Sequence, residues 1–268
     1  MPSREIGLRG GAKLEFRVKT ANIDAHSVEF GGKTPNALMI LSQIIASFYI
    51  KEGNVAVEGL YGNVLPMSPL EREMVKKVPY DPASDMKILG TNAEAGGTNY
   101  SSLERVWYRP TLEIIVMQGG YVAAEGFSNI IPGSAMARVS CRLINNQTGD
   151  EIIDKVVMHI NKYCPPGATI EYTIKPAYLR PVKFPADTKE YKSIADALTK
   201  MYGRPPQQIA SSASVGPLIE VKEQLGHYAY SLGVQQSDKN GMRQMSFTIV
   251  QYSKRTIGLL LLFAAYCR

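Results

Sequence analysis

The first apolar positions of the chain change from strand spacing to helix spacing. Residues 13–20 alternate apolar and charged side chains, which predicts a half-buried strand. Apolar side chains then recur at helical spacing over residues 38–48. We expect Thr34 to cap this helix and Pro35 to fill its first position.

A long excursion separates this first part from the next regular pattern. Residues 51–109 are rich in Gly, Pro, Asn and Ser and hold one helical pattern, at 69–77, so we interpret them as an insertion. Beyond it, strand patterns cover residues 112–117, 134–144 and 169–174, and an amphipathic helix covers 150–163. Strand, helix, strand, strand, helix, strand is the order of a ferredoxin-like split βαβ sandwich.

The last third of the chain has a different pattern. A linker with three prolines, residues 175–185, precedes two helical patterns at 189–202 and 217–225. A buried strand at 228–232, a polar loop and a terminal helix in the apolar run 257–267 follow. We therefore predict an α+β to α/β protein with two domains, residues 1–178 and 179–268, the second resembling an α/β layer.

Composition narrows the function classes. The net charge is +6 with a pI near 9.1. The sequence has no stripe of basic and aromatic residues, so we do not expect a nucleic-acid site. The three cysteines have no C-x-x-C spacing, which favours reduced thiols in the cytoplasm. The N-terminus has no apolar signal region, and the run 257–267 is shorter than the roughly 20 residues that span a bilayer, so we expect no membrane partner.

His26 is the first candidate functional residue. It is one of three histidines and stands shortly before Gly31-Gly32, in a loop ahead of the first helix. Such a loop lets the backbone approach a ligand, although a lone His is commonly a satisfied polar side chain. His159, inside a helix pattern, and His227, after a helix-ending glycine, are typical of structural histidines.

Two further motifs contain polar side chains suited to ligand binding. Asn129 lies in a glycine-bounded loop, and Arg142 on the next strand could hold a carboxylate bidentately. The plain alternative is a surface hairpin with a solvated Arg. Ser214, in the Ser-rich loop 211–216, could help bind an anion at a helix N-terminus or simply cap that helix.

A zinc hydrolase site is not evident in the pattern. Such a site needs clustered His and carboxylate ligands and a base that activates water. The chain has no H-x-D pair beside a strand end and no H-E-x-x-H. The acidic residues of the excursion show no coherent spacing, and we interpret them as solvated; they include Glu71, Glu73, Asp81 and Asp85.

Six motifs in register resemble the zinc aminoacylase/dipeptidase family of metallopeptidases. They are Leu8–Gly11, the D-x-H-S…G-G stretch Asp24–Gly32, Trp107–Ile114, Gly126–Pro132, Val139–Leu143 and the loop Ser212–Gly216. The resemblance implies that residues 1–178 are the family's lid, or dimerisation, domain with an insertion at about 51–109. It implies that residues 179–268 are the C-terminal portion of the catalytic domain, and that the N-terminal catalytic half is missing.

The resemblance also implies residue roles. His26 would match a lid histidine that reaches across a dimer and helps hold the oxyanion, with Asn129 assisting. Arg142 would bind the substrate carboxylate, and Ser214 would belong to the substrate loop. Met242 stands where the family's remaining metal-binding His is expected, and a thioether is a poor zinc ligand beside carboxylates.

These observations leave two functions open. The first is a homodimeric pseudoenzyme, without a cofactor of its own, that keeps elements for binding a small peptide or N-acyl amino acid. The second is the C-terminal half of a split zinc-dependent dipeptidase, carboxypeptidase or deacylase, with zinc held only if a separate N-terminal half supplies ligands.

Overall fold

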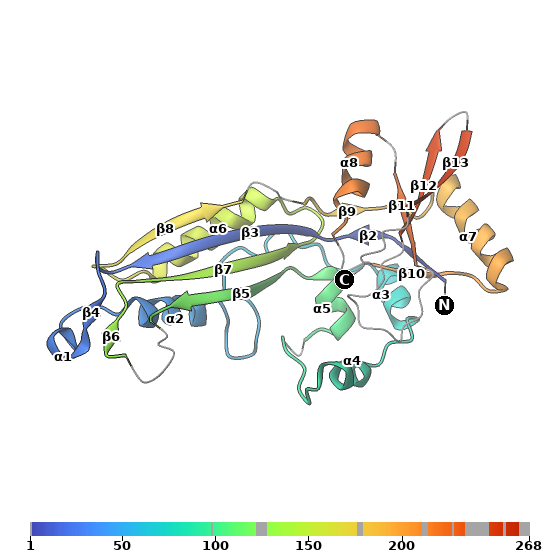
Figure 1. Ribbon diagram of the computed structural model, residues 1–268. Coiled ribbons are helices and arrows are strands. Elements are labelled where there is room, and N and C mark those ends of the chain that lie inside the picture. The colour runs from blue at the N-terminus through green and yellow to red at the C-terminus, as the bar shows by residue number, and fades with distance from the viewer. Residues whose placement is uncertain are drawn as a thin grey trace.

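The sheets and helices form two bodies side by side (Figure 1). The computed structural model describes residues 2–97, 99–121, 128–175, 179–210, 214–226, 228–233, 247–253 and 256–262, with only the backbone described beyond residue 230. Each body has its own cluster of buried apolar side chains. None of the described helices is long and apolar enough to cross a membrane.

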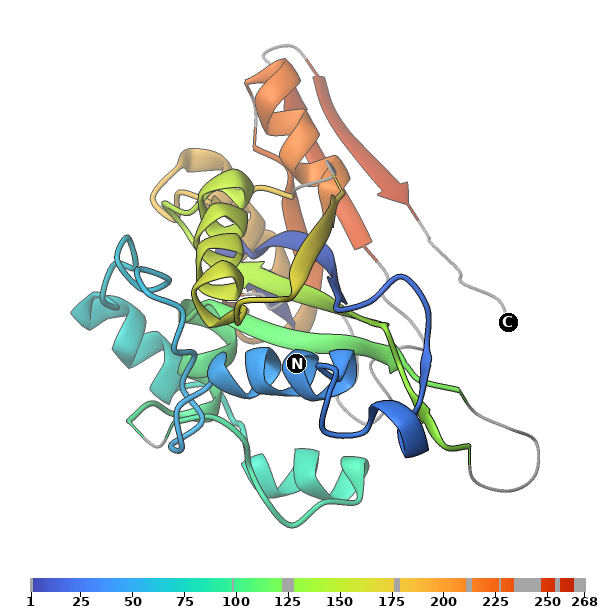
Figure 2. The ribbon, with the colours of Figure 1, turned by 90° about the vertical axis from the view of Figure 1, so that its left-hand side faces the viewer.

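The first body is the split βαβ sandwich that the sequence predicts. Its antiparallel sheet has the order β5-β7-β3-β8, formed by Thr111–Gly119, Ser134–Leu143, Gly10–Lys19 and Thr169–Ile174. Strand β3 pairs along its whole length with β7, from Gly10 opposite Leu143 to Lys19 opposite Ser134. Helices α2 (Ala37–Ser47) and α6 (Gly149–Tyr163) cover one face, and the other face stays open (Figure 2).

Local sequence explains where these two helices begin. The side chain of Asn36, not that of Thr34, caps α2 by accepting from the amides of Leu38 and Met39. Thr148 caps α6, because its hydroxyl accepts from the Glu151 amide. The apolar faces of both helices pack on the alternate residues of β3 and β7 that point inward, so the binary pattern is confirmed.

A small projection lies at the end of the sheet farthest from the second body (Figure 1). It consists of β4 (Ala25–His26), the short helix α1 (Ser27–Phe30) and β6 (Ile130–Ile131). His26 pairs with Ile130 across β4 and β6. The Asp24 carboxylate accepts from the Gly133 amide at 2.8 Å and so fixes the base of the projection.

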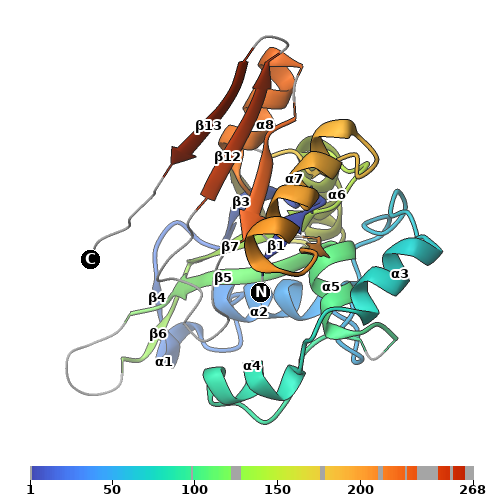
Figure 3. The ribbon, with the colours of Figure 1, turned by 90° about the vertical axis from the view of Figure 1, so that its right-hand side faces the viewer.

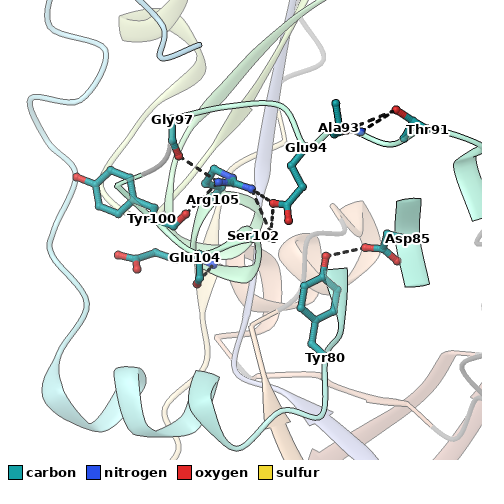
Figure 4. Close-up of polar contacts among 11 residues, drawn as sticks. Tyr80, Asp85, Thr91, Ala93, Glu94, Gly97, Tyr100, Ser102, Glu104 and Arg105 are labelled. Atoms are coloured by element: carbon teal, nitrogen blue, oxygen red, sulfur yellow. Dashed lines mark hydrogen bonds and ion pairs between the residues drawn. The ribbon is translucent and has the colours of Figure 1, made fainter. Parts of the chain in front are cut away.

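The excursion is more regular than its composition predicts. It contains α3 (Pro69–Lys76), α4 (Pro82–Leu89) and α5 (Ser102–Tyr108), whereas the sequence pattern indicated only the first. Arg105 closes its last loop by donating to the carbonyls of Gly97 and Tyr100 and by pairing with Glu94 (Figure 4). Short helices capped by Asp81 and Ser101 escape a search for apolar periodicity because they bury few side chains.

The excursion also ties the two bodies together, which corrects the interpretation of Glu71. Glu71 is only 9% exposed, and its carboxylate accepts from Ser68 in a capping box and from Lys183 Nζ at 2.8 Å. Lys183 belongs to β9 (Val182–Lys183), which pairs with β2 (Gly7–Leu8) between the bodies. Charge-assisted hydrogen bonds to the helix cap and to Lys183 offset the cost of removing the Glu71 carboxylate from water.

The second body contains a five-stranded sheet of order β10-β1-β11-β12-β13 with α7 and α8 beside it (Figure 3). The strands are Gln207–Ile209, Ser3–Glu5, Tyr230–Gly233, Phe247–Ser253 and Thr256–Leu262, and the helices are Lys189–Tyr202 and Gly216–Leu225. Strand β1 pairs in parallel with β10 and antiparallel with β11. The boundary at residue 178 stays a prediction.

The prediction of a terminal helix in the run 257–267 is wrong for the residues of this run that the structure describes. Residues 256–262 form β13, which pairs antiparallel with β12 in a hairpin from Phe247 opposite Leu262 to Ser253 opposite Thr256. A continuous apolar run fits a buried strand as well as a buried helix. The β-branched and aromatic residues of β12 decide in favour of the hairpin.

Candidate functional site

Arg142 lies on the open face of the sheet, where the sandwich meets the second body. It is the ninth residue of β7, opposite Gly11 on β3 and Thr111 on β5. Its Nη1 donates to Ser214 Oγ at 3.0 Å, and Ser214 Oγ donates to the Gly10 carbonyl at 3.4 Å. Two predicted site residues that are 72 positions apart are therefore in direct contact.

Ser214 does not cap helix α8, so the capping alternative is wrong. Helix α8 has Val215 as its N-cap, and no side chain of the residues described caps it. Ser214 is half-buried and bonds to Arg142 across the two bodies instead. The Arg142 side chain remains exposed, so both groups are able to contact a ligand from the open side.

Arg9 is a residue that the sequence analysis did not single out as a candidate. It is 5% exposed, and its Nη2 donates to the Arg109 carbonyl at 3.0 Å and to Thr111 Oγ1 at 3.1 Å. Burial, with the charge of Arg142 as the second cause, lowers the pKa of Arg9 to about 10, while Glu113 acts in the opposite direction. Arg9 therefore stays charged at neutral pH. The available signal was an Arg directly before Gly10-Gly11, at the start of a strand.

His26 and Asn129 are brought together in the projection. The Ser27 amide donates to the Asn129 carbonyl at 2.8 Å, and both His26 and Asn129 are exposed. His26 Nδ1 accepts from the Val28 amide at 3.3 Å. Because Nδ1 is the acceptor, a neutral His26 carries its proton on Nε2, where it is available to donate to a ligand.

The two groups lie at opposite ends of one strand. Strand β7 spans the ten residues from Ser134 to Leu143. At about 3.3 Å per residue its length is about 30 Å. His26 pairs beside Ile130 before this strand begins, whereas Arg142 stands at its far end. Within one copy of the chain, His26 and Arg142 cannot contact the same small ligand.

The described residues do not fit a metal centre. None of their His, Cys, Asp and Glu side chains gather in groups of three or more that could hold an ion. Met242 and His227 lie outside the described residues. His159 is structural, as predicted: it is buried, stacks on Phe48 and bonds to Ser47 Oγ at 2.9 Å.

Curated relatives are dipeptidases, and the chain spans half of their length or less. Cysteinylglycine-S-conjugate dipeptidase of Corynebacterium striatum is 30% identical over 175 residues, which are 65% of this chain and 36% of that protein. Human Beta-Ala-His dipeptidase is 22% identical over 228 residues, 84% of this chain and 45% of that protein.

Solved structures share the fold. Human carnosine dipeptidase 1 matches with a TM-score of 0.72 at 21% identity, over 84% of this chain and 48% of that one. A metallo-carboxypeptidase from Sulfolobus solfataricus matches with a TM-score of 0.71 at 25% identity, over 84% of this chain and 50% of that one. The family profile described as the peptidase dimerisation domain matches residues 6–168, well over half of the sequence. The chain therefore belongs to the peptidase dimerisation domain family.

Proposed function

We propose that this chain forms the dimerisation and substrate-holding part of a dipeptidase-like peptidase and does not hydrolyse peptides by itself. Arg142 and Ser214 bind the carboxylate of a small peptide or N-acyl amino acid. The observation that carries this proposal is the hydrogen bond from Arg142 to Ser214, on an open sheet face between the two bodies. It presents a guanidinium and a hydroxyl side by side. When a carboxylate binds, the Ser214 hydroxyl proton leaves its 3.4 Å bond to the Gly10 carbonyl and is donated to one carboxylate oxygen, while free N–H groups of Arg142 donate to the other.

The second element of the proposal is a homodimer in which His26 serves the partner. His26 Nε2–H is suited to donate to the carbonyl oxygen of a ligand and to the oxyanion that develops from it. The length of β7 separates His26 from Arg142 in one copy, so a ligand held by Arg142 would meet the His26 of a second copy. The match to a dimerisation domain supports this arrangement.

The binding test uses two ligands that differ in charge only at the carboxyl end. N-acetyl-leucine and N-acetyl-leucinamide are titrated into the full chain by calorimetry, and the ratio of the amide Kd to the acid Kd is the readout. Hydrogen bonds to a charged group contribute about 1.5–3 kcal/mol, so the ratio should be roughly 10 to 100. Arg142→Gln should bring it close to one.

Arg138 supplies a matched control for this variant. It lies four residues earlier on the same strand and the same face, and pairs with Glu15 at 2.7 Å rather than with the proposed site. Arg138→Gln should leave the ratio of the two Kd values unchanged. Equal affinity of the wild-type chain for the acid and the amide would contradict the proposed function.

An active split peptidase is the second candidate, because the chain spans half or less of its relatives. The test is metal content after zinc, manganese or cobalt loading, with a dipeptide and N-acyl amino acid hydrolysis screen, alone and with a separate N-terminal half. No bound metal and no turnover in the isolated chain are the expected results. About one or two metals per chain with hydrolysis would favour the enzyme instead.

A further inference from the structure

A second arginine, Arg9, lies close enough to Arg142 for their charges to interact, and it is almost fully buried. Arg9 is 5% exposed, and its Nε has no hydrogen-bond partner among the described residues. The positive charge of Arg142 acts on it unfavourably, and Glu113 offsets this only in part. Two like charges in range of each other at a partly buried site cost free energy, which an anionic ligand recovers.

Arg9 is also joined to the strand beside Arg142. Its Nη2 donates to Thr111 Oγ1 at 3.1 Å and to the Arg109 carbonyl at 3.0 Å, at the start of β5. Thr111 is the residue opposite Arg142 in the pairing of β5 with β7. The buried guanidinium therefore fixes the strand edge that flanks Arg142.

Gly10 and Gly11, which follow Arg9 directly, lie on the other side of Arg142, where β7 pairs with β3. Gly11 is the partner of Arg142 in the pairing of β3 with β7, and the Gly10 carbonyl accepts from Ser214 Oγ. A Cβ on Gly10 would lie 2.4 Å from the Leu179 carbonyl oxygen, so the chain after β8 passes directly over this position. Residues 9–11 thus contact Thr111 and Ser214 and pair with the strand that carries Arg142.

We propose that Arg9 is the second cation of this site: a positioning residue that orients Arg142 through Thr111 and makes the site select a carboxylate over an uncharged group. The inference rests on the proposed function, because it concerns the same ligand end. Arg9 acts through its neighbour and through its charge, not by contact with the ligand.

The test measures selectivity rather than affinity alone. The ratio of the N-acetyl-leucinamide Kd to the N-acetyl-leucine Kd is determined for Arg9→Gln and Arg9→Lys. Removal of a nearby charge should lower the ratio by about 3- to 10-fold in Arg9→Gln. Arg9→Lys keeps a charge but loses the planar guanidinium whose Nη2 reaches both acceptors, so its ratio should fall between that of Arg9→Gln and that of the wild type.

Arg4 provides the control for the loss of a buried arginine. It is 9% exposed, donates to the Tyr191 carbonyl at 2.6 Å and lies over the Tyr191 ring, in the second body. Arg4→Gln should lower stability in the same way but leave the ratio at the wild-type value. A fall in Arg4→Gln as large as in Arg9→Gln would overturn the inference, since it would reflect stability alone.

Thr111→Val keeps the test decisive if Arg9→Gln does not fold. It removes the hydroxyl that accepts from Arg9 and preserves the β-branched shape, and it should lower the ratio by about 2- to 3-fold. A wild-type ratio in Thr111→Val and in whichever Arg9 variants fold, with a collapsed ratio in Arg142→Gln, would refute the role of Arg9 and leave the proposed function intact. An unchanged ratio in Arg142→Gln would refute the proposed function itself.

Discussion

Acidification should destabilise the sandwich through His159, and the variant His159→Phe should remove this effect. Nε2 of His159 bonds to Ser47 Oγ at 2.9 Å, and the ring lies between Phe48 and Tyr163, at centroid distances of 5.2 and 4.6 Å. Burial holds the pKa of His159 below its ordinary 6.5. The hydrogen bond to Ser47 opposes this effect, and the charge of Lys162 adds to it.

Proton binding by His159 decides whether stability rises or falls with pH. A histidine that resists protonation when folded takes up its proton in the unfolded state first, so stability is lost as pH falls below about 6.5. The loss cannot exceed about 1.4 kcal/mol at pH 5.5, the limit reached when the folded form binds no proton. Carboxylates with lowered pKa values, such as Glu151, act only at lower pH.

His159→Phe suits this test because the site can accept it. Ser47 Oγ still donates to the Ile44 carbonyl at 2.7 Å, and a phenyl ring extends the aromatic stack. The variant loses one neutral hydrogen bond, about 0.5–1.5 kcal/mol, and gains apolar burial, so its stability at pH 7.5 should stay within about 1 kcal/mol of the wild type.

The assay is urea unfolding followed by circular dichroism at pH 7.5, 6.5 and 5.5. The free energy of unfolding of the wild type should fall from pH 7.5 to pH 5.5. The fall should be smaller in His159→Phe, by at most about 1.4 kcal/mol. His26→Asn, which replaces an exposed histidine by another helix-capping residue, should behave like the wild type. Parallel curves for wild type and His159→Phe would refute the reasoning.

Other outcomes follow from single contacts. Glu71→Gln should lower the free energy of unfolding by about 1–2 kcal/mol in urea titrations, because it breaks the pair with Lys183. Although burial opposes it, hydrogen bonding to Lys183 holds the pKa of Glu71 below 4.5, so this contribution should persist at neutral pH and disappear as pH falls through the acid range. Gly10→Ala should cost about 1–3 kcal/mol through its clash with the Leu179 carbonyl, measured as a lower unfolding midpoint. Burial raises the pKa of Cys141 to about 12, so mass spectrometry should find this thiol unalkylated by iodoacetamide until the chain unfolds.

The sandwich could be predicted because its periodicity is local. The alternation of residues 13–20 and the amphipathic pattern of 150–163 each report which face is buried, and β3 and α6 follow them closely. The helix over 189–202 also has its predicted bounds, since Thr188 caps it and Gly203 ends it. In these segments the local preference and the tertiary packing agree.

The remaining features depend on partners that are distant in sequence. The contact between Arg142 and Ser214 and the burial of Arg9 exist only after the chain has folded back on itself. The apolar run from residue 257 becomes a strand because β12 is there to pair with it. Periodicity within a segment reports nothing about such partners.

The sheet of the second body can be completed only late in synthesis, because strand β1 pairs with strands that are made much later. Its residues Ser3–Glu5 precede the sandwich in sequence but lie between β10 and β11, which begin at Gln207 and Tyr230. At roughly 5–20 residues per second, about 10–40 s separate the synthesis of β1 from that of β10. During this interval the sandwich can fold while β1 still lacks the two strands that flank it. A ribosome-bound chain therefore has a window in which a chaperone can protect this strand, and stalling before β10 would expose it to wrong partners.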